Sequence, residues 1–471
     1  MLGVVIGIGF FLSLFSVFSA NKERSLLLII SMSGFIQALW GMFQLFSMLY
    51  GQEQNHGESL YGVFQQRNVF ASYLVTTYIA ALVLLSRYTF SEEKINRLLL
   101  IGIIFFSYLV GILIFTIQSR TGYLSLLIAL LLLIIGGTGE FRKSMLFPML
   151  FLGFGAILGT MNIGIGGIAG TRLLDSLSNP AMMMEVSSSG RDIIWRVSWE
   201  MLKDNWLSGV GYGNFEPSFL NYEAQHYLQY GGNIYPYTNH PHNELLLWAV
   251  EGGFLPGTAL ASYSIYILWR MYKMGAQVLP YAAMLIPLVA HAMLEYPFYH
   301  SAIHWILFLT LLFLFELHAS KTVERQLKYK GLTKGVAFIT VLFASAFFIT
   351  SLQAAYKVKE YYKVDPSQRT ISMLENIINP VSVKPQLDYI ALNTILQHGL
   401  KTKDKTSLNT FLELANELVK QYPRPGLYLG ILYAYNALGD EAAFDKMLKQ
   451  ASYYYPSDER LKKLSLKKNG T

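Results

Sequence analysis

Long apolar runs constrain this chain more than any other feature of its sequence. Hydrophobicity is concentrated in runs of about 18–25 residues, and an α-helix of that length spans the roughly 30 Å of hydrocarbon in a bilayer. Of the 471 residues, 53% are hydrophobic and only 14% are charged. Strands of this length and apolarity would leave unpaired backbone groups in lipid. The predicted fold class is therefore all-α, a polytopic bundle of membrane helices.

We expect about ten membrane-spanning helices. The first apolar run is similar in length to a signal peptide, but it lacks a basic start and opens with glycines, so we interpret it as a span. The sequence has no cysteine, which excludes a disulfide framework and a thiolate metal site. The predicted spans are 1–19, 26–50, 69–88, 98–117, 122–138, 144–163, 245–269, 279–297, 301–318 and 333–355.

Lysine and arginine residues fall on alternate connections between these spans. The positive-inside rule makes the basic connections cytoplasmic. The net charge of +7 then fits contact with anionic lipid, and no nucleic-acid partner is needed. Ten spans with an external C-terminus place Met1 outside, which implies a further upstream span or one span fewer. The predicted cytoplasmic connections are 21–25, 86–97, 140–144, 270–277 and 320–334, and the stretches expected to face outward are 51–68, 118–121, 164–244, 298–300 and everything after 355.

The C-terminal region changes to a polar, helical pattern at about Tyr356. The stretch YPRPGLYLGILYAYNALGDEAAFDKMLKQASYYYP predicts a helix, a turn at Gly439–Asp440 and a second helix. That pattern resembles one tetratricopeptide-like hairpin, which needs neighbours to bury its apolar face, and ISMLENIINP and LNTFLELANELVKQYP are the candidate neighbours. The predicted domains are 1–163 (N-terminal spans), 164–244 (a long external loop), 245–355 (C-terminal spans) and 356–471 (a helical domain).

Two arginines on the short outward-facing stretches lie directly beside spans, Arg67 and Arg120, and a third, Arg191, begins an amphipathic stretch in the long loop. Arginine keeps its charge at any working pH and has a planar fork of donors that fits phosphate oxygens. A pyrophosphate group at the outer membrane face is therefore one candidate ligand. The alternative is that each arginine simply extends to the membrane interface. The stretch after Arg191 is amphipathic, with an expected apolar face of Ile194, Val197, Trp199 and Met201.

The stretch NHPHNELLLWAVEGG (239–253) places His240 and His242 directly ahead of an apolar helix. An imidazole at this boundary can act as a general base or hydrogen-bond a substrate oxygen. Two alternatives remain. The H-x-H-x-E spacing offers metal ligands, although no clear remaining ligand set follows. The second alternative is structural, with Asn243 or His242 near the N-cap of an interfacial helix.

Several of these motifs together resemble a known family. HPHNELLLWAVEGG resembles the HN-x-x-L…E-x-G signature of the O-antigen ligase and polymerase superfamily, and GVGYGNF (209–215) is similar to the glycine-aromatic motif that precedes it. QQRNVFASYL (65–74), QSRTGYLSLLIAL (118–130) and LEYPFYHSAIHWILFL (294–309) resemble one branch, the bacterial O-linked oligosaccharyltransferases that glycosylate pilins and other exported proteins. The resemblance runs in order from about Gly51 to Glu316.

The resemblance implies a multi-pass protein of the bacterial inner membrane with a periplasmic active site. Such an enzyme transfers a preassembled glycan from an undecaprenyl-pyrophosphate carrier to a Ser/Thr hydroxyl of an exported acceptor such as a pilin. The implied partners are the lipid-linked donor, the periplasmic acceptor protein and membrane lipid. Neither a nucleotide sugar, nor a metal, nor any other cofactor is implied.

The resemblance also implies roles for individual residues. His242 matches the catalytic histidine, and Arg120 and Arg191 match arginines that hold the pyrophosphate. Arg67 lies in the branch's own outer-loop motif. For the aromatic 295–304 stretch, an interfacial aromatic belt is the alternative explanation. The residues given a supporting role are Gln66, Asn68, His240, Asn243, Glu251, Glu295, Tyr296, His300 and His304.

Three alternatives to protein glycosylation remain. The same superfamily includes a ligase that moves O-antigen onto lipid A-core and a polymerase that joins repeat units on the carrier, and residue spacing does not separate these acceptors. A transporter is the second alternative, but it would be expected to carry ionisable groups in mid-span, often in paired halves. The third is a non-catalytic scaffold, which would leave the outer arginines and histidines unexplained.

Overall fold

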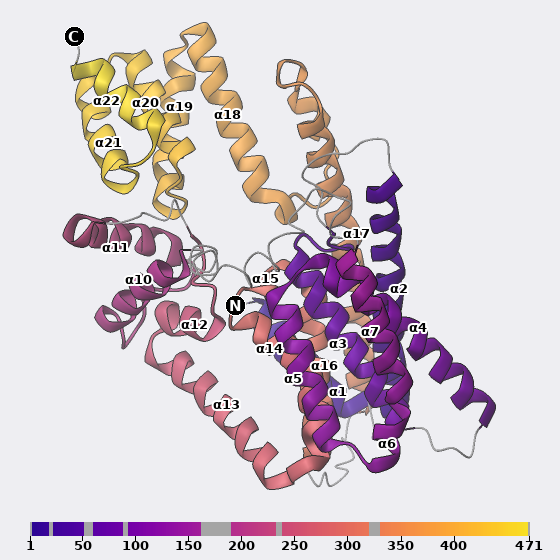
Figure 1. Cartoon of the computed structure of the whole chain (residues 1–471). Helices are drawn as coiled ribbons and strands as arrows, with labels where there is room; N and C mark the ends of the chain where they lie inside the picture. Colours follow the sequence, from indigo (N-terminus) through magenta and orange to yellow (C-terminus); the bar gives the residue numbers. More distant parts are fainter. Residues whose placement is uncertain are drawn as a thin grey trace. The chain divides into compact units, whose positions relative to one another are not determined.

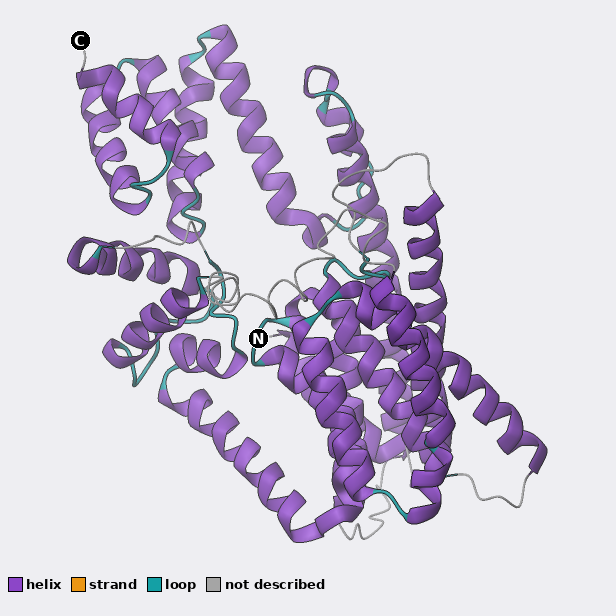
Figure 2. Ribbon diagram, viewed as in Figure 1, coloured by secondary structure: helices purple, strands orange, loops and turns teal. Residues whose placement is uncertain are grey.

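The computed structural model describes residues 2–17, 22–50, 60–87, 93–161, 190–231, 238–319 and 330–469. Within these ranges every regular element is a helix, and Figure 2 shows no strand among them. The all-α prediction is therefore confirmed. Residues 162–189 and 232–237 of the predicted long loop lie outside the described residues, as does the basic connection at 320–329.

The chain forms two compact units. Figure 1 labels the helices in their order along the chain. Unit 1 comprises Met1–Asp192, Pro241–Trp248 and Pro256–Lys330. Unit 2 comprises Ile193–His240, Ala249–Leu255 and Gly331–Thr471. Each unit therefore combines segments that are distant in the sequence.

Five helical stretches in the described residues are long and apolar enough to cross a membrane, fewer than the ten we expected. The helices α5 (Arg120–Gly136) and α16 (Ala302–Ala319) are apolar but shorter than the roughly 20 residues of a usual span. The predicted span 245–269 is also interrupted, because Gly253 has a φ of 75° and separates α12 (Glu244–Gly252) from α13 (Phe254–Met274). The five stretches are Glu23–Leu49, Arg67–Ser86, Arg97–Ile117, Gly139–Met161 and Phe254–Ala292.

The centre of unit 1 is α3 (Arg67–Ser86), whose side chains are buried without interruption from Val69 to Leu85. It is apolar all round, as expected for a helix enclosed by others. The Gln66-Arg67-Asn68 motif lies at the start of α3, and four neighbouring helices hold this end of α3 in a fixed position. They are α2 (Glu23–Tyr50), α4 (Glu93–Ile117), α5 and α14 (Leu279–Ala292).

Glycines allow α4 to lie very close to α7 (Leu146–Met161). A Cβ on Gly155 would come within 2.2 Å of the Tyr108 carbonyl oxygen, and one on Gly111 within 2.3 Å of the Leu152 carbonyl oxygen. Small residues at helix contacts let backbones approach in this way inside membranes, where packing supplies much of the association energy.

The end of unit 1 opposite the α3 motif is closed by a polar cluster. Glu23 at the start of α2 pairs with Arg87 Nε at 3.2 Å and with His318 Nε2 at 3.1 Å. The Tyr281 hydroxyl donates to Glu23 at 2.6 Å, and its ring stacks on His318 with centroids 4.1 Å apart. The cluster connects α2, α3, α14 and α16 at one end of the bundle.

In unit 2, the predicted hairpin after Tyr422 forms as helices α20 (Pro425–Leu438) and α21 (Glu441–Tyr454). Gly439 ends the first helix with a left-handed backbone, φ 74°, and the Asp440 side chain caps the second by accepting from Ala443 N at 3.0 Å. These helices share a core with α18 (Lys384–Thr402), α19 (Lys405–Gln421) and α22 (Glu459–Asn469). Leu220 of α11 (Phe215–Tyr230) belongs to the same core.

Two sequence expectations for unit 2 are wrong. ISMLENIINP does not form a helical neighbour for the hairpin, because only Ile371–Leu374 forms a 3-10 turn and Asn376 takes a positive φ of 63°. The second concerns α10 (Arg191–Asp204), where Ile194, Val197 and Met201 are buried but Trp199 is 54% exposed. Trp199 lies two residues after Val197, too far round the helix to share its face. The change in composition at Tyr356 falls inside one helix, α17 (Lys330–Lys363).

Candidate functional site

The Gln66-Arg67-Asn68 motif lies at the start of α3, and its three side chains have different environments. Arg67 is exposed, whereas Gln66 and Asn68 are half-buried. Asn68 Nδ2 donates a hydrogen bond to Glu295 Oε1 at 2.7 Å. The rigid start of the central helix thus holds Asn68 against a carboxylate that is far away in the sequence.

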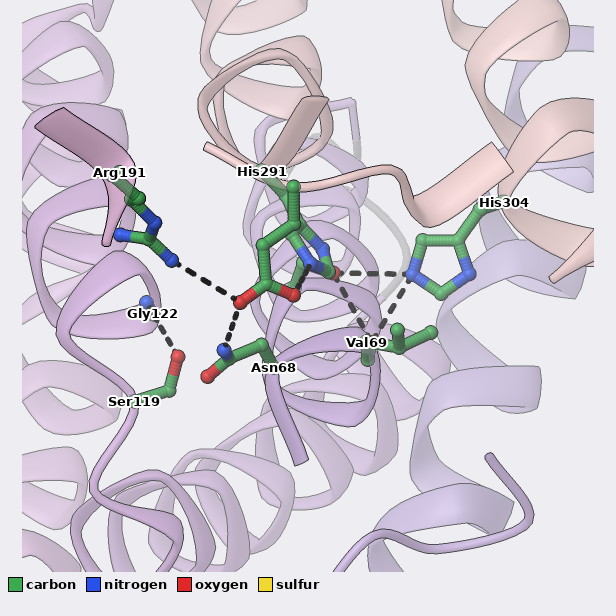
Figure 3. Close-up of polar contacts among 9 residues, drawn as sticks. Asn68, Val69, Ser119, Gly122, Arg191, His291 and His304 are labelled. Carbon is green, nitrogen blue, oxygen red and sulfur yellow. Dashed lines mark hydrogen bonds and ion pairs between the residues drawn. The ribbon is translucent and has the colours of Figure 1, made fainter. Parts of the chain in front are cut away.

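Glu295 is the centre of a polar cluster in unit 1. It lies between α14 and the short α15 (Pro297–His300), and its side chain is only 9% exposed. Arg191 Nη2 approaches Oε1 at 3.6 Å, and His291 Nε2 approaches Oε2 at 3.3 Å. In Figure 3, Arg191 and Asn68 extend toward this one carboxylate from different helices. Burial raises the pKa of Glu295. The hydrogen bonds from His291 and Asn68 and the charges of His291 and Arg191 outweigh burial, and they lower this pKa below its ordinary value.

Arg120 occupies the first position of α5 and is exposed. Gln118, two residues earlier, has a left-handed backbone with φ 55°, and the Ser119 side chain caps α5 by accepting from Gly122 N at 3.1 Å. A non-glycine residue in this conformation is strained, and such strain tends to occur at functional sites. The structure places neither Arg120 nor Arg67 in the contacts around Glu295.

His242 also has a positive φ, 54°. Asn243, the next residue, caps α12 as predicted, with Oδ1 accepting from Leu246 N at 2.9 Å. Its Nδ2 donates to the Met293 carbonyl at 3.1 Å, which ties the histidine motif to the segment that carries Glu295. The His242 ring is 5.5 Å from the Tyr296 ring, centroid to centroid, and Tyr296 stacks on His300 at 4.5 Å. His242, Tyr296 and His300 are therefore neighbours.

Glu251 and His240 belong to unit 2, apart from this group. Glu251 Oε1 accepts backbone hydrogen bonds from Gly213 N at 3.0 Å and from Phe215 N at 3.2 Å, at the start of α11. The Glu251 carboxylate thus anchors the glycine-aromatic stretch 209–215. His240 is buried, and its backbone N–H and carbonyl both bond the Thr238 hydroxyl, at 3.3 and 2.7 Å.

Glycines explain why the two motifs dock so closely. A Cβ on Gly209 would come within 2.3 Å of the Glu251 carbonyl oxygen, and one on Gly253 within 2.4 Å of the Leu207 carbonyl oxygen. Both glycines have positive φ, 69° and 75°. Val210 N then bonds the Val250 carbonyl at 2.9 Å. The backbone of the E-x-G segment, Glu251–Gly253, thus packs directly against the backbone of GVGYGNF.

Sequence reasoning missed two residues of the Glu295 cluster, Ser72 and His291. Ser72 Oγ lies 2.8 Å from His291 Nδ1 and 3.1 Å from His304 Nε2. A signal was present, because an ionisable residue such as His291 inside an apolar run is expensive and tends to be functional. Within the described part of the chain, no three histidine or carboxylate side chains gather in a way that would hold a metal ion.

Three protein-family models match successive parts of the chain. Protein glycosylation ligase matches residues 60–85, O-antigen ligase matches 101–262, and the C-terminal part of virulence factor membrane-bound polymerase matches 281–467. No curated protein and no solved structure matches the chain significantly. The three matches support the O-antigen ligase and polymerase superfamily, and with the apolar helices they support a multi-pass membrane protein that transfers glycans.

Proposed function

We propose that this protein transfers a preassembled glycan from undecaprenyl pyrophosphate to a Ser/Thr hydroxyl of an exported protein such as a pilin, at the periplasmic face of the inner membrane. One observation carries the proposal. Asn68, Arg191 and Glu295 meet in one cluster, and each comes from a different one of the three matched stretches. The short match to a protein glycosylation ligase covers Asn68 and favours a protein as the acceptor.

The donor's pyrophosphate would bind Arg191 and Arg120. Arg191 directs Nη2 toward Glu295, which leaves the other donors of its guanidinium for phosphate oxygens, and its side chain is 35% exposed. Arg120 adds an exposed charge at the N-terminus of α5, where the helix dipole favours anions. Both charges would offset the negative charge that grows on the leaving phosphate as the anomeric C–O bond breaks.

His242 would act as the general base. The acceptor hydroxyl oxygen attacks the anomeric carbon, its proton passes to His242, and undecaprenyl pyrophosphate leaves from the opposite face. The anomeric configuration therefore inverts. A positioned general base contributes about 10²–10⁴-fold to a rate. Tyr296, 5.5 Å away, would hold the imidazole in place.

Reconstitution tests this function. The chain, or its His242→Ala or Arg120→Ala variant, is co-expressed with a pilin-like acceptor in a host that makes undecaprenyl-linked glycan but lacks such a ligase. We expect a glycan-sized gain in the acceptor's intact mass, which disappears with His242→Ala and weakens with Arg120→Ala even at high donor supply. A fully active His242→Ala would refute the catalytic role.

The two longer matches favour a second candidate, because they are described as an O-antigen ligase and a membrane-bound polymerase. The same experiment separates the acceptors when the host's lipopolysaccharide ladder is read beside the pilin mass. An unmodified pilin with newly decorated lipid A-core would assign the chain to the O-antigen ligases. Longer glycans on the carrier, with no transfer to either acceptor, would indicate a polymerase.

A further inference from the structure

A chain of hydrogen bonds runs from Glu295 into the core of unit 1. Figure 3 labels its two histidines, His291 and His304. Glu295 faces His291 at 3.3 Å, His291 faces Ser72 at 2.8 Å, Ser72 faces His304 at 3.1 Å, and His304 faces the Ser301 hydroxyl at 2.8 Å. Both histidines are fully buried and Ser72 is 2% exposed. The Ser72–His291–Glu295 order resembles a nucleophile triad, but a hydroxyl at this depth is closed to a lipid-linked substrate. The chain needs a different role.

Two groups that can only accept, the Val69 carbonyl and the Glu295 carboxylate, fix which nitrogen carries a hydrogen at the two ends of this chain. His304 Nε2 lies 3.1 Å from the Val69 carbonyl oxygen, which can only accept, so Nε2 carries the hydrogen and Nδ1 accepts from Ser301. The Ser72 hydroxyl faces two acceptors, the Val69 carbonyl oxygen at 3.1 Å and His291 Nδ1 at 2.8 Å, and its oxygen lies 3.1 Å from His304 Nε2. The ionised Glu295 carboxylate can only accept, so His291 Nε2 carries a hydrogen and donates it to Oε2.

We infer that this hydrogen-bond chain makes His291 a positioning residue for Arg191, by fixing the Glu295 carboxylate in the orientation that holds Arg191 and Asn68 at the site. Both oxygens of Glu295 are engaged, Oε1 by Asn68 and Arg191 and Oε2 by His291. A carboxylate held on both oxygens cannot turn away from Arg191. The inference rests on the proposed function, because Arg191 is there the residue that binds the pyrophosphate.

The charge of Glu295 gives the inference a pH signature. Four groups face it or its partners: Arg191 on α10, His291 on α14, Asn68 on α3 and, through Ser72, His304 on α16. His291 is among the groups that lower the pKa of Glu295 against the effect of burial. The ionised carboxylate is present above this lowered pKa and is lost as the pH falls through it. Without His291, Glu295 becomes protonated at a higher pH.

The test uses the purified full-length protein in lipid nanodiscs with undecaprenyl-pyrophosphate glycan and a pilin acceptor. Initial rates against donor concentration, and binding of undecaprenyl pyrophosphate alone, are measured from about pH 4 to pH 8. We expect His291→Met to raise the KM for the donor about tenfold. The acid limb, the low-pH part where the rate or the binding falls, should move to higher pH in both the rate profile and the binding profile. His291→Gln, whose amide can still donate to Glu295, should recover most of this loss.

His318→Gln is the matched control, because His318 also pairs with a glutamate, Glu23, but at the opposite end of the same bundle. Its acid limb should stay at the wild-type pH. Ser72→Ala is a second, smaller change that interrupts the chain and should move the limb in the same direction, which keeps the test decisive if His291→Met fails to fold.

The outcomes separate the two proposals. An active wild type whose acid limb and donor KM are unchanged in both His291→Met and Ser72→Ala would overturn the inference and leave the proposed function intact. A wild type that binds undecaprenyl pyrophosphate without transferring glycan would refute the proposed function. In that case, a shifted binding profile in His291→Met would still support the inference, and an unshifted one would overturn it.

Discussion

Asn68 donates a 2.7 Å hydrogen bond to Glu295 across 227 positions of the sequence. The bond joins the start of the central helix α3 to the segment that follows α14. The acceptor is a buried carboxylate that also pairs with Arg191. Two motifs that appear independent in the sequence therefore form one polar cluster.

Replacing Asn68 with alanine should impair transfer more than folding. The change removes one hydrogen bond to a charged acceptor, a contribution of about 1.5–3 kcal/mol. We expect the transfer rate to fall about tenfold to a hundredfold, measured in the reconstituted assay at saturating acceptor. Asn416→Ala, which removes a 3.2 Å bond to the Tyr435 hydroxyl in the C-terminal helices, is the control. Equal losses in both variants would mean that Asn68 acts only through stability.

Replacing Glu251 with alanine should loosen the start of α11. The carboxylate accepts from Gly213 and Phe215, and loss of a helix cap costs about 1 kcal/mol. We expect faster hydrogen exchange at these two amides, read by mass spectrometry of peptides covering 209–220. Glu251→Gln keeps an acceptor oxygen and should stay close to wild type. Unchanged exchange in Glu251→Ala would contradict the anchoring role.

Gly253→Ala and Gly231→Ala separate backbone strain from steric clash. Both glycines have positive φ, 75° and 68°, so a side chain is strained at either position. Only Gly253 is also crowded, because its Cβ would lie 2.4 Å from the Leu207 carbonyl oxygen, whereas no atom of the described residues lies within 4 Å of a Cβ on Gly231. Gly253→Ala should therefore expose the 205–215 stretch to limited proteolysis, and Gly231→Ala should not. Equal cleavage would refute the close docking.

Gly155→Ala and Gly153→Ala test the contact between α4 and α7. A Cβ on Gly155 would come within 2.2 Å of the Tyr108 carbonyl oxygen, and one on Gly153 meets nothing within 4 Å. Both glycines lie on α7, and both variants add one methyl group. We expect a lower thermal midpoint in detergent for Gly155→Ala and an unchanged or slightly higher one for Gly153→Ala. A midpoint that is equal in both variants would contradict the packing.

The helices were predictable from the sequence because apolar runs in lipid have few other solutions. Their bounds were less so. Gly253 ends α12 through its backbone conformation, and one glycine inside an apolar run does not reveal its φ. The segment ISMLENIINP reads as an amphipathic helix, yet Asn376 takes a left-handed backbone and ends the 3-10 turn early. The helical preference of this segment is overridden by the packing around it.

Some residues of the Glu295 cluster could be named from the sequence, but their contacts with one another could not. Arg191, Asn68 and Glu295 each stand out beside an apolar run, but only the folded chain brings them together. Glu251 belongs to the same sequence motif as His242, but its carboxylate anchors the glycine-aromatic stretch 209–215 and does not join the Glu295 cluster. His291 lies inside an apolar helix, and its role depends on Ser72 of another helix, a pairing that no spacing within one segment encodes.

The placement of α11 has a consequence for protein engineering. Its first turn is held by Glu251, while Leu220 lies in the C-terminal core and Glu216 pairs with Arg424 at 3.3 Å. A chimera that exchanges only residues 384–469 with those of a relative would leave α11 facing a foreign surface. The helix and the C-terminal helices should therefore be grafted together, as one exchangeable cassette.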